Sequence, residues 1–292
     1  MRLTRAFVVV ATIAGTAGCG HEDVNTTLTR VSRAREVVAD LTVQFTMASD
    51  AANRSVMADT DEASVEFAKE SRASAAAVQQ DITRLRETLT TLAYQPEDAL
   101  LTEFANNFVE YQKLDDSILG LAVENTNLKA QRLAFGPAQD AANEFRDALH
   151  AITPANSGDA WRVEALVATA LLTVREIQVL QAPHIANADE AVMTKMEQQM
   201  STSQTAARKS LDALRSVSAP SSRAAIGKAA SALNRFFELN TQLIALSRRN
   251  SNVRSLMLSL DEKRRLTVTC QENLRALQEA LAKRGYSGIR EH

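Results

Sequence analysis

LDDSILGLAVENTNLKAQRL (Leu114–Leu133) and LNTQLIALSRRNSNVRSLML (Leu239–Leu258) are two copies of one helical pattern within this sequence. Adding 125 to the residue numbers of the first copy superimposes its apolar positions on those of the second, and its Asn-x-Asn pair on the second pair. Farther upstream, adding 128 takes Asp61-Glu62-Ala63 to Asp189-Glu190-Ala191. Similarity at a fixed spacing indicates a repeated structural unit, so we expect four helices in the same order in each half.

Apolar residues recur at steps of three and four throughout both halves, which is the spacing of helices that bury one face. One such stripe comprises Phe104, Phe108, Tyr111, Leu114, Ile118 and Leu121. Residues that form turns or strands are scarce, with 9 Gly, 5 Pro and 4% aromatics, and no convincing stretch alternates with period two. The sequence predicts an all-α protein of two tandem up-down four-helix bundles, packed at shallow angles as in coiled coils.

Helix breakers divide the chain. Pro96 suits the first turn of a helix, and Gly136-Pro137 is expected to end one helix and begin another. The richest breaker cluster, Thr153–Gly158, is the expected boundary between the halves. We therefore assign residues 19–153 to the first bundle, 154–286 to the second, and 287–292 to a polar tail.

Residues 1–18 have the pattern of an export signal. Arg2 and Arg5 precede an apolar run from Ala6 to Ala14, which is too short to span a bilayer as a helix. The run ends in Gly15-Thr16-Ala17-Gly18-Cys19, which resembles the lipobox of bacterial lipoproteins, although Thr16 stands where that family prefers Leu. The resemblance implies cleavage before Cys19 and lipidation of its thiol. An ordinary signal peptide with an incidental Cys is the alternative.

Gly20, rather than Asp, follows the cysteine. By the sorting habit of bacterial lipoproteins, this residue implies the periplasmic side of the outer membrane, with the inner membrane as the alternative. Several acyl chains would hold the protein firmly on the membrane.

The residues from Tyr111 to Leu149 carry a second resemblance. They include Leu119-Gly120-Leu121-Ala122, Asn125-Thr126-Asn127 and Gly136-Pro137, and the stretch Leu246–Leu256 is the equivalent in the second half. This pattern is similar to the periplasmic four-helix-bundle sensor domains of methyl-accepting chemotaxis proteins. It implies binding of a small molecule, such as an organic or amino acid, or of a signalling partner, and it is compatible with a homodimer. In a related family, the helical bimodular sensors, two long helices run through both of two stacked bundles. The cluster at 153–158 favours separate bundles instead.

Chemotaxis receptors continue into a second transmembrane helix and a signalling hairpin, whereas only a short polar tail follows Tyr286 in this sequence. We therefore expect signalling through a partner. The alternative function is a structural or adaptor lipoprotein that acts only through protein contacts.

Candidate ligand-binding residues lie on the repeated stripe. Asn125 and Asn250 are each followed four residues later by a cation, Lys129 and Arg254, on nearly the same helical face. An amide beside a cation in a bundle interior can hold a carboxylate. The alternative, which we favour, is a buried Asn that fixes helix register beside a cation that extends to solvent.

Arg54, beside Ser49 and Asn53, is similar in position to the ligand-binding arginines of amino-acid chemoreceptors; a solvated Arg is the favoured alternative. The run Lys263-Arg264-Arg265, with Arg248, Arg249 and Arg254, predicts a basic, mostly solvated end on the second bundle.

Signals for an enzyme, a metal or a cofactor are missing from the sequence. Its four histidines are scattered and form no helical ligand pair, and no glycine-rich phosphate loop or nucleophile elbow is present. Cys270 lies on an apolar stripe, which predicts a buried, inert thiol. A net charge of −2 gives no indication of nucleic acid as a partner. We therefore expect a binding protein rather than an enzyme.

Overall fold

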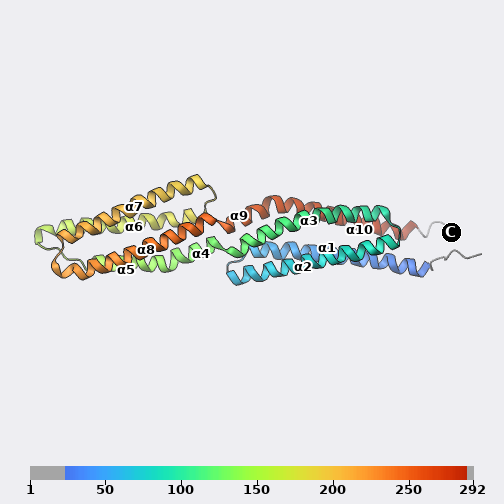
Figure 1. Ribbon diagram of the computed structural model, residues 1–292, viewed down its shortest axis with the longest axis horizontal. Coiled ribbons are helices and arrows are strands. Elements are labelled where there is room, and N and C mark those ends of the chain that lie inside the picture. The colour runs from blue at the N-terminus through green and yellow to red at the C-terminus, as the bar shows by residue number, and fades with distance from the viewer. Residues whose placement is uncertain (1–23, 288–292) are drawn as a thin grey trace, which may run out of the picture.

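The computed structural model describes residues 24–287, and every regular element within that range is helical (Figure 1). The only strand-like pairing there is an isolated bridge between Pro154 and Ser218. The prediction of an all-α protein is confirmed. The expected signal peptide, Cys19 and nearly all of the polar tail lie outside the described residues.

The helices of the first half are a hairpin followed by one long, twice-interrupted helix. They are α1 (Val24–Met57), α2 (Asp61–Thr91), α3 (Gln95–Glu124), α4 (Thr126–Leu133), the π-helix η1 (Ala134–Ala138) and α5 (Gln139–His150). The second half repeats this order. It consists of the 3₁₀ turn η2 (Ser157–Asp159), α6 (Ala160–Ala186), α7 (Glu190–Val217), the 3₁₀ turn η3 (Pro220–Ser222), α8 (Arg223–Arg249), α9 (Ser251–Leu258), the π-helix η4 (Ser259–Lys263) and α10 (Arg264–Ser287).

Local sequence accounts for the helix ends. The hydroxyl of Thr60 accepts a hydrogen bond from the amide of Ala63 and so caps α2, and Asp189 caps α7 in the same way. Pro96 lies in the first turn of α3, as predicted. Asn125 and Asn250 have positive φ angles of 49° and 53°, and each ends one helix and precedes the next. Asn tolerates this left-handed conformation better than most residues.

Two hydrophobic cores lie end to end along the molecule (Figure 1). The core of the first lobe is formed by α1, α2, α3 and α10, and its largest members are Phe45, Phe104, Phe108 and Tyr111. The core of the second lobe is formed by α5, α6, α7 and α8. The two lobes meet at a waist where α3 continues into α4 and α8 into α9.

The lobes do not coincide with the halves of the sequence, which corrects the expected division at residues 153 and 154. Leu274, Leu277 and Leu281 of α10 pack in the first lobe, whereas Phe145 and Leu149 of α5 pack in the second. The long helix of each half therefore crosses the waist and completes the lobe of the other half. Two long helices therefore run through both lobes, whereas the cluster at 153–158 favours separate bundles.

The expected break at Gly136-Pro137 is also corrected, because the chain stays helical through it. Both residues lie inside the π-helix η1, and α5 follows without an intervening loop. The π-helix η4 occurs 125 residues later, at the equivalent place in the second half. A π-turn contains one more residue than an α-turn, so it accommodates a proline. The extra residue also rotates the buried face of the following helix relative to that of the preceding helix.

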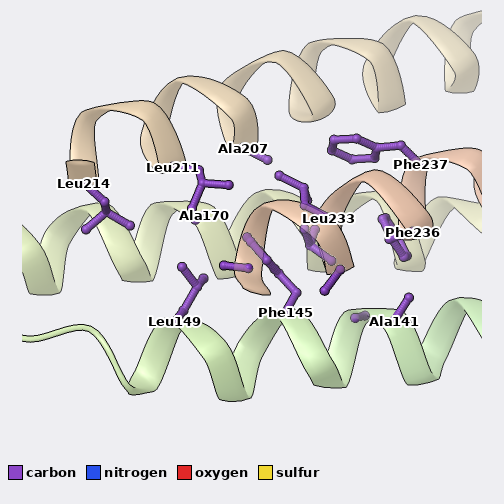
Figure 2. Packing of buried hydrophobic residues seen from close by; sticks show 14 of the residues in the cluster. Ala141, Phe145, Leu149, Ala170, Ala207, Leu211, Leu214, Leu233, Phe236 and Phe237 are labelled. Carbon is purple, nitrogen blue, oxygen red and sulfur yellow. The ribbon is translucent and has the colours of Figure 1, made fainter. Parts of the chain in front are cut away.

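Figure 2 shows how the second core is filled. Phe145 and Leu149 from α5 point toward Leu211 and Leu214 of α7 and Leu233 of α8. Small residues, among them Ala141, Ala170 and Ala207, occupy positions between the large side chains. Alternation of large and small residues lets the four helices approach closely without leaving voids.

Replacement of Phe145 by alanine is expected to destabilise the protein by about 3–5 kcal/mol, because it removes a fully buried ring and leaves a cavity. Urea unfolding followed by circular dichroism measures the change. Phe135→Ala is the matched control, since that ring, 72% exposed, lies ten residues away on η1 and its loss leaves stability nearly unchanged. Equal effects of the two substitutions would contradict the assignment of the core.

A helix that crosses a bilayer needs about 20 predominantly apolar residues. None of the helices within residues 24–287 combines the length and the apolar character needed to cross a bilayer.

Candidate functional site

The waist brings together the two Asn-x-Asn stretches that define the repeat. The amide of Thr126 donates to Ser251 Oγ, and the amide of Ser251 donates to Thr126 Oγ1, at 3.1 and 3.0 Å. The amide of Asn127 donates to Asn252 Oδ1, and the reverse bond is also made, both at 3.1 Å. Each half thereby caps the first turn of the short helix of the other half, which satisfies amides that a new helix leaves unpaired.

The side-chain amides of the waist bind mainly one another. Asn252 Nδ2 donates to Asn125 Oδ1 at 2.8 Å, and Asn127 Nδ2 lies 2.7 Å from Asn250 Oδ1. Asn250 Nδ2 donates to the carbonyl of Asn187 at 2.7 Å. Within the described residues, only Asn125 Nδ2 among these groups is buried without a hydrogen-bond partner. This network fixes the register of the two long helices.

The cations expected beside Asn125 and Asn250 do not join this network. Lys129 Nζ donates to the carbonyl of Glu124 at 2.8 Å, and the side chain of Arg254 is exposed. Arg54 is also exposed, binds Glu70 at 2.6 Å and Asp50 at 3.2 Å, and lies over the ring of Phe67. The predicted residues thus lie in separate surroundings, and no side-chain hydrogen bond within the described residues joins Asn125 or Asn250 to its expected cation.

The predicted basic run contains one residue that is not solvated. Lys263, the last residue of η4, is only 1% exposed, and its Nζ lies 2.6 Å from Asp115 Oδ1 of α3. It belongs to the first lobe, not to the second bundle as expected. Ser71 Oγ donates to Asp115 Oδ2 at 3.1 Å, and the ring of Tyr111 lies beside the ammonium.

Burial dominates the electrostatics of this pair. Desolvation raises the pKa of Asp115 and lowers the pKa of Lys263, while the attraction between the two groups opposes both shifts. Desolvation also raises the pKa of Tyr111. Cys270, two turns beyond Lys263 on the buried face, is fully buried as predicted, and burial raises the pKa of its thiol to about 12. A neutral, enclosed thiol has little reactivity at physiological pH.

A groove of about 400 Å³ opens from Lys263 to the surface between α1 and the segment η4–α10. Its polar lining consists of Ser49, Asn53, Ser259, Lys263, Arg264, Thr267 and Gln271. Its apolar lining consists of Val56, Met57, Leu256, Leu260 and Val268. The hydroxyl of Ser259 donates to Asn53 Oδ1 across the groove at 3.2 Å. The lining therefore combines two cations with apolar side chains and includes no carboxylate.

The repeat provides an internal comparison for this groove. Subtracting 125 from Lys263 leads to Ala138, and adding 125 to Asp115 leads to Asn240, so the second lobe lacks the buried ion pair. A groove of about 410 Å³ nonetheless lies between α5 and α6, with Arg146 and Arg175 in its lining. The buried pair is thus a property of the first lobe and not a requirement of the fold.

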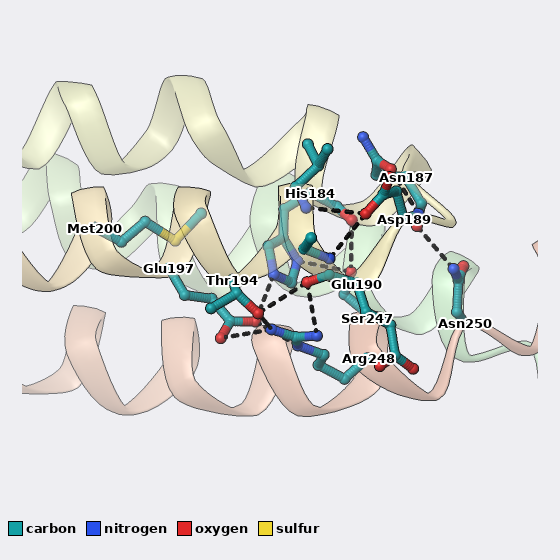
Figure 3. Close-up of polar contacts among 12 residues, drawn as sticks. His184, Asn187, Asp189, Glu190, Thr194, Glu197, Met200, Ser247, Arg248 and Asn250 are labelled. Atoms are coloured by element: carbon teal, nitrogen blue, oxygen red, sulfur yellow. Dashed lines mark hydrogen bonds and ion pairs between the residues drawn. The ribbon is translucent and has the colours of Figure 1, made fainter.

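A second polar cluster joins α6, α7 and α8 near the waist (Figure 3). The ring of His184 is fully buried; its Nδ1 lies 2.8 Å from Ser247 Oγ and its Nε2 lies 2.8 Å from Glu197 Oε1. Arg248 binds both oxygens of Glu197, at 2.6 and 3.0 Å. The hydrogen bonds from Arg248 lower the pKa of Glu197, which keeps that carboxylate ionised.

Sequence reasoning missed both clusters. Residue spacing along one helix pairs only residues of that helix, whereas the partners of His184 come from two other helices. Lys263 was grouped with its exposed neighbours Arg264 and Arg265. A signal was available, since Lys263 lies seven residues before the buried Cys270 and Asp115 lies four after the buried Tyr111, each on the apolar face of its helix.

Comparisons with protein-family models, with curated protein sequences and with solved structures find no match to this chain.

Proposed function

We propose that this protein is a lipid-anchored periplasmic sensor-like module that binds a small organic anion in the groove beside Lys263 and passes the signal to a partner. The observation that carries the proposal is the lining of the groove, in which Lys263 and Arg264 meet apolar side chains and no carboxylate. Small-molecule sites typically combine such an apolar surface with a few polar groups that orient the ligand.

The location of the groove supports the same function. It lies against η4, and π-helical turns occur frequently at functional sites. Its walls come from α1 and from the segment that leads out of the waist into α10, so a ligand there contacts both halves of the sequence. Of the two cations, Lys263 is already paired with Asp115, whereas Arg264 is exposed, so Arg264 is the group we expect to bind the ligand's carboxylate.

The test is a thermal-shift and calorimetry screen of residues 20–292, without the lipid, against organic acids, amino acids and phosphate. An organic acid present at about 100 times its dissociation constant adds about 2.7 kcal/mol of stability, which raises the melting temperature by roughly 5 °C or more. Arg264→Ala is expected to weaken binding about tenfold, because a charged hydrogen bond is lost.

Arg175→Ala, in the corresponding groove of the second lobe, is the control and should leave the affinity unchanged. The absence of binding by every acid, or equal losses in the two variants, would contradict the proposal.

A second candidate function, an adaptor that acts through protein contacts, is favoured by the outer face of α6. Trp161, Leu172 and Val179 lie on one stripe of this helix and are 69%, 60% and 65% exposed. Exposed apolar stripes of this kind are found at protein interfaces. Crosslinking that recovers a partner, combined with no response to any small molecule, would favour this candidate.

A further inference from the structure

The hydroxyl of Ser247 has two acceptors within reach but only one proton to donate. Its oxygen lies 2.8 Å from His184 Nδ1 and 2.9 Å from the carbonyl oxygen of the same residue. The hydroxyl can therefore donate to the ring or to the backbone, and the choice depends on whether Nδ1 carries a proton. Figure 3 shows these groups side by side, where the end of α6 meets α8.

The other ring nitrogen is constrained. Glu197 is held ionised by Arg248, and an ionised carboxylate only accepts hydrogen bonds, so His184 Nε2 carries a proton whether the ring is neutral or charged. In the neutral ring, Nδ1 accepts the proton of Ser247. In the charged ring, Nδ1 donates to Ser247 Oγ, and the hydroxyl proton turns to the carbonyl of His184.

The carbonyl that gains this bond lies at a helix end. His184 is in the last turn of α6, where carbonyls lack the usual helical partner, and its carbonyl accepts one long hydrogen bond, from the amide of Asn187 at 3.5 Å. The carbonyl of Asn187 in turn accepts from Asn250 of the waist. A positive charge at this end of a helix is also favoured by the helix dipole.

We propose that His184 is a proton-responsive latch, whose protonation fastens the carboxyl end of α6 to Ser247 of α8 and so tightens the α6–α7 turn against the waist. Histidine is the side chain that ordinarily changes charge between pH 5 and 8. The latch goes beyond the proposed ligand site, because it lies in the other lobe and does not involve the groove.

The first half shows that the fold does not need a histidine at this position. The caps of α2 and α7, Thr60 and Asp189, are 129 residues apart, and at the same offset Ser55 and Ser64 correspond to His184 and Met193. There, Ser55 Oγ donates to the carbonyl of Ser64, and Ser64 Oγ donates to the carbonyl of Ser55, at 2.9 and 3.0 Å. These two bonds join the helices of the first hairpin with no group that titrates near neutral pH.

The charged groups around His184 are the following. Glu197 of α7 contacts the ring directly, and Arg248 of α8 neutralises Glu197 while also donating to the carbonyl of Glu190. The cations of the adjacent α4 are engaged elsewhere, Lys129 with the carbonyl of Glu124 and Arg132 with Asp61. Glu197 is therefore the only charged group that forms a hydrogen bond or ion pair with the ring among the described residues, and it compensates the charge that protonation adds.

Nuclear magnetic resonance of residues 20–292 between pH 8 and pH 5 tests the latch. The expected result is that the Nδ1 resonance of His184 changes from the acceptor to the protonated form. Over the same range, amide exchange of residues 186–189, corrected for the intrinsic effect of pH, slows about threefold to tenfold. Ser247→Ala should keep the ring titration and abolish the change in exchange, whereas His150→Gln, on the exposed side of α5, should alter neither.

Two results would overturn the latch. One is an Nδ1 that stays in a single protonation state from pH 5 to pH 8. The other is a change in exchange that persists in Ser247→Ala or in His184→Gln. If His184→Gln does not fold, Ser247→Ala alone decides the question, since it leaves the ring and its bond to Glu197 in place.

Discussion

Replacing Lys263 by methionine is expected to destabilise the protein by about 3–5 kcal/mol at pH 7, because it leaves the carboxylate of Asp115 buried without its counter-charge. Methionine keeps most of the volume, so the loss reports the charge and not a cavity. Denaturant unfolding gives the free energy difference. Arg264→Ala is the matched control at the next residue, where the exposed side chain should contribute less than about 0.5 kcal/mol.

The stability of the Lys263→Met variant is expected to depend on pH with a definite sign. Burial raises the pKa of Asp115 above its ordinary value even with Lys263 present, and removal of the ammonium removes the main influence that lowers it. A group whose pKa is raised in the folded state binds its proton more tightly there than in the unfolded chain. Lys263→Met should therefore lose stability as pH rises from the acidic range toward neutral, more steeply than the natural protein.

The double substitution Lys263→Met with Asp115→Asn should recover most of the loss, because no buried charge remains. The second lobe supports this expectation, since Ala138 and Asn240 stand at the equivalent positions. A double variant that is less stable than Lys263→Met alone would show that the ion pair has a different role from the one described.

Cutting the chain between Asn156 and Ser157 should produce two fragments that fold only together. The first fragment lacks α10, whose Leu274, Leu277 and Leu281 fill the first core, and the second lacks α5 with Phe145. Each fully buried leucine contributes about 1.5–3 kcal/mol, so the loss of α10 is comparable with the total stability of a domain, about 5–15 kcal/mol.

Circular dichroism and light scattering of residues 20–156 and 157–292, alone and mixed, make the measurement. The expected result is weak, non-cooperative unfolding of each fragment and a cooperative 1:1 complex after mixing. Two separately folded monomers would contradict the exchange of α5 and α10, and they are the result that tandem bundles would give. An uncut chain treated in the same way is the control.

The helical pattern predicts where the helices lie in the sequence better than it predicts which helices pack against one another. The stripe of Phe104, Phe108 and Tyr111 is fully buried, and the two Asn-x-Asn stretches meet at the waist. Periodicity identifies which face of a helix is apolar but not which helix covers it. The apolar stripe from Cys270 to Leu281 is equally suited to the core of either lobe. The sequence therefore does not determine that α5 and α10 each pack in the lobe of the other half.

The candidate sites were harder to predict for a related reason. Asp115 and Lys263 are 148 residues apart in the sequence. His184 forms hydrogen bonds with Glu197 and Ser247, which belong to two other helices. Each pairing depends on how helices pass one another at the waist. Two π-turns and two left-handed Asn residues set that geometry, and only the Asn positions are evident from a repeated motif.

Both ends of the described chain lie at the same end of the elongated molecule, as Figure 1 shows. Arg35 of α1 donates to the carbonyl of Leu281 in α10 at 3.0 Å, which places the first and last helices together there. The long helix from Gln95 to His150 covers roughly 80 Å at about 1.5 Å per residue. The bridged loops at Pro154 and Ser218 lie at the opposite end, so under the proposed lipid anchor the length of the molecule would separate them from the membrane.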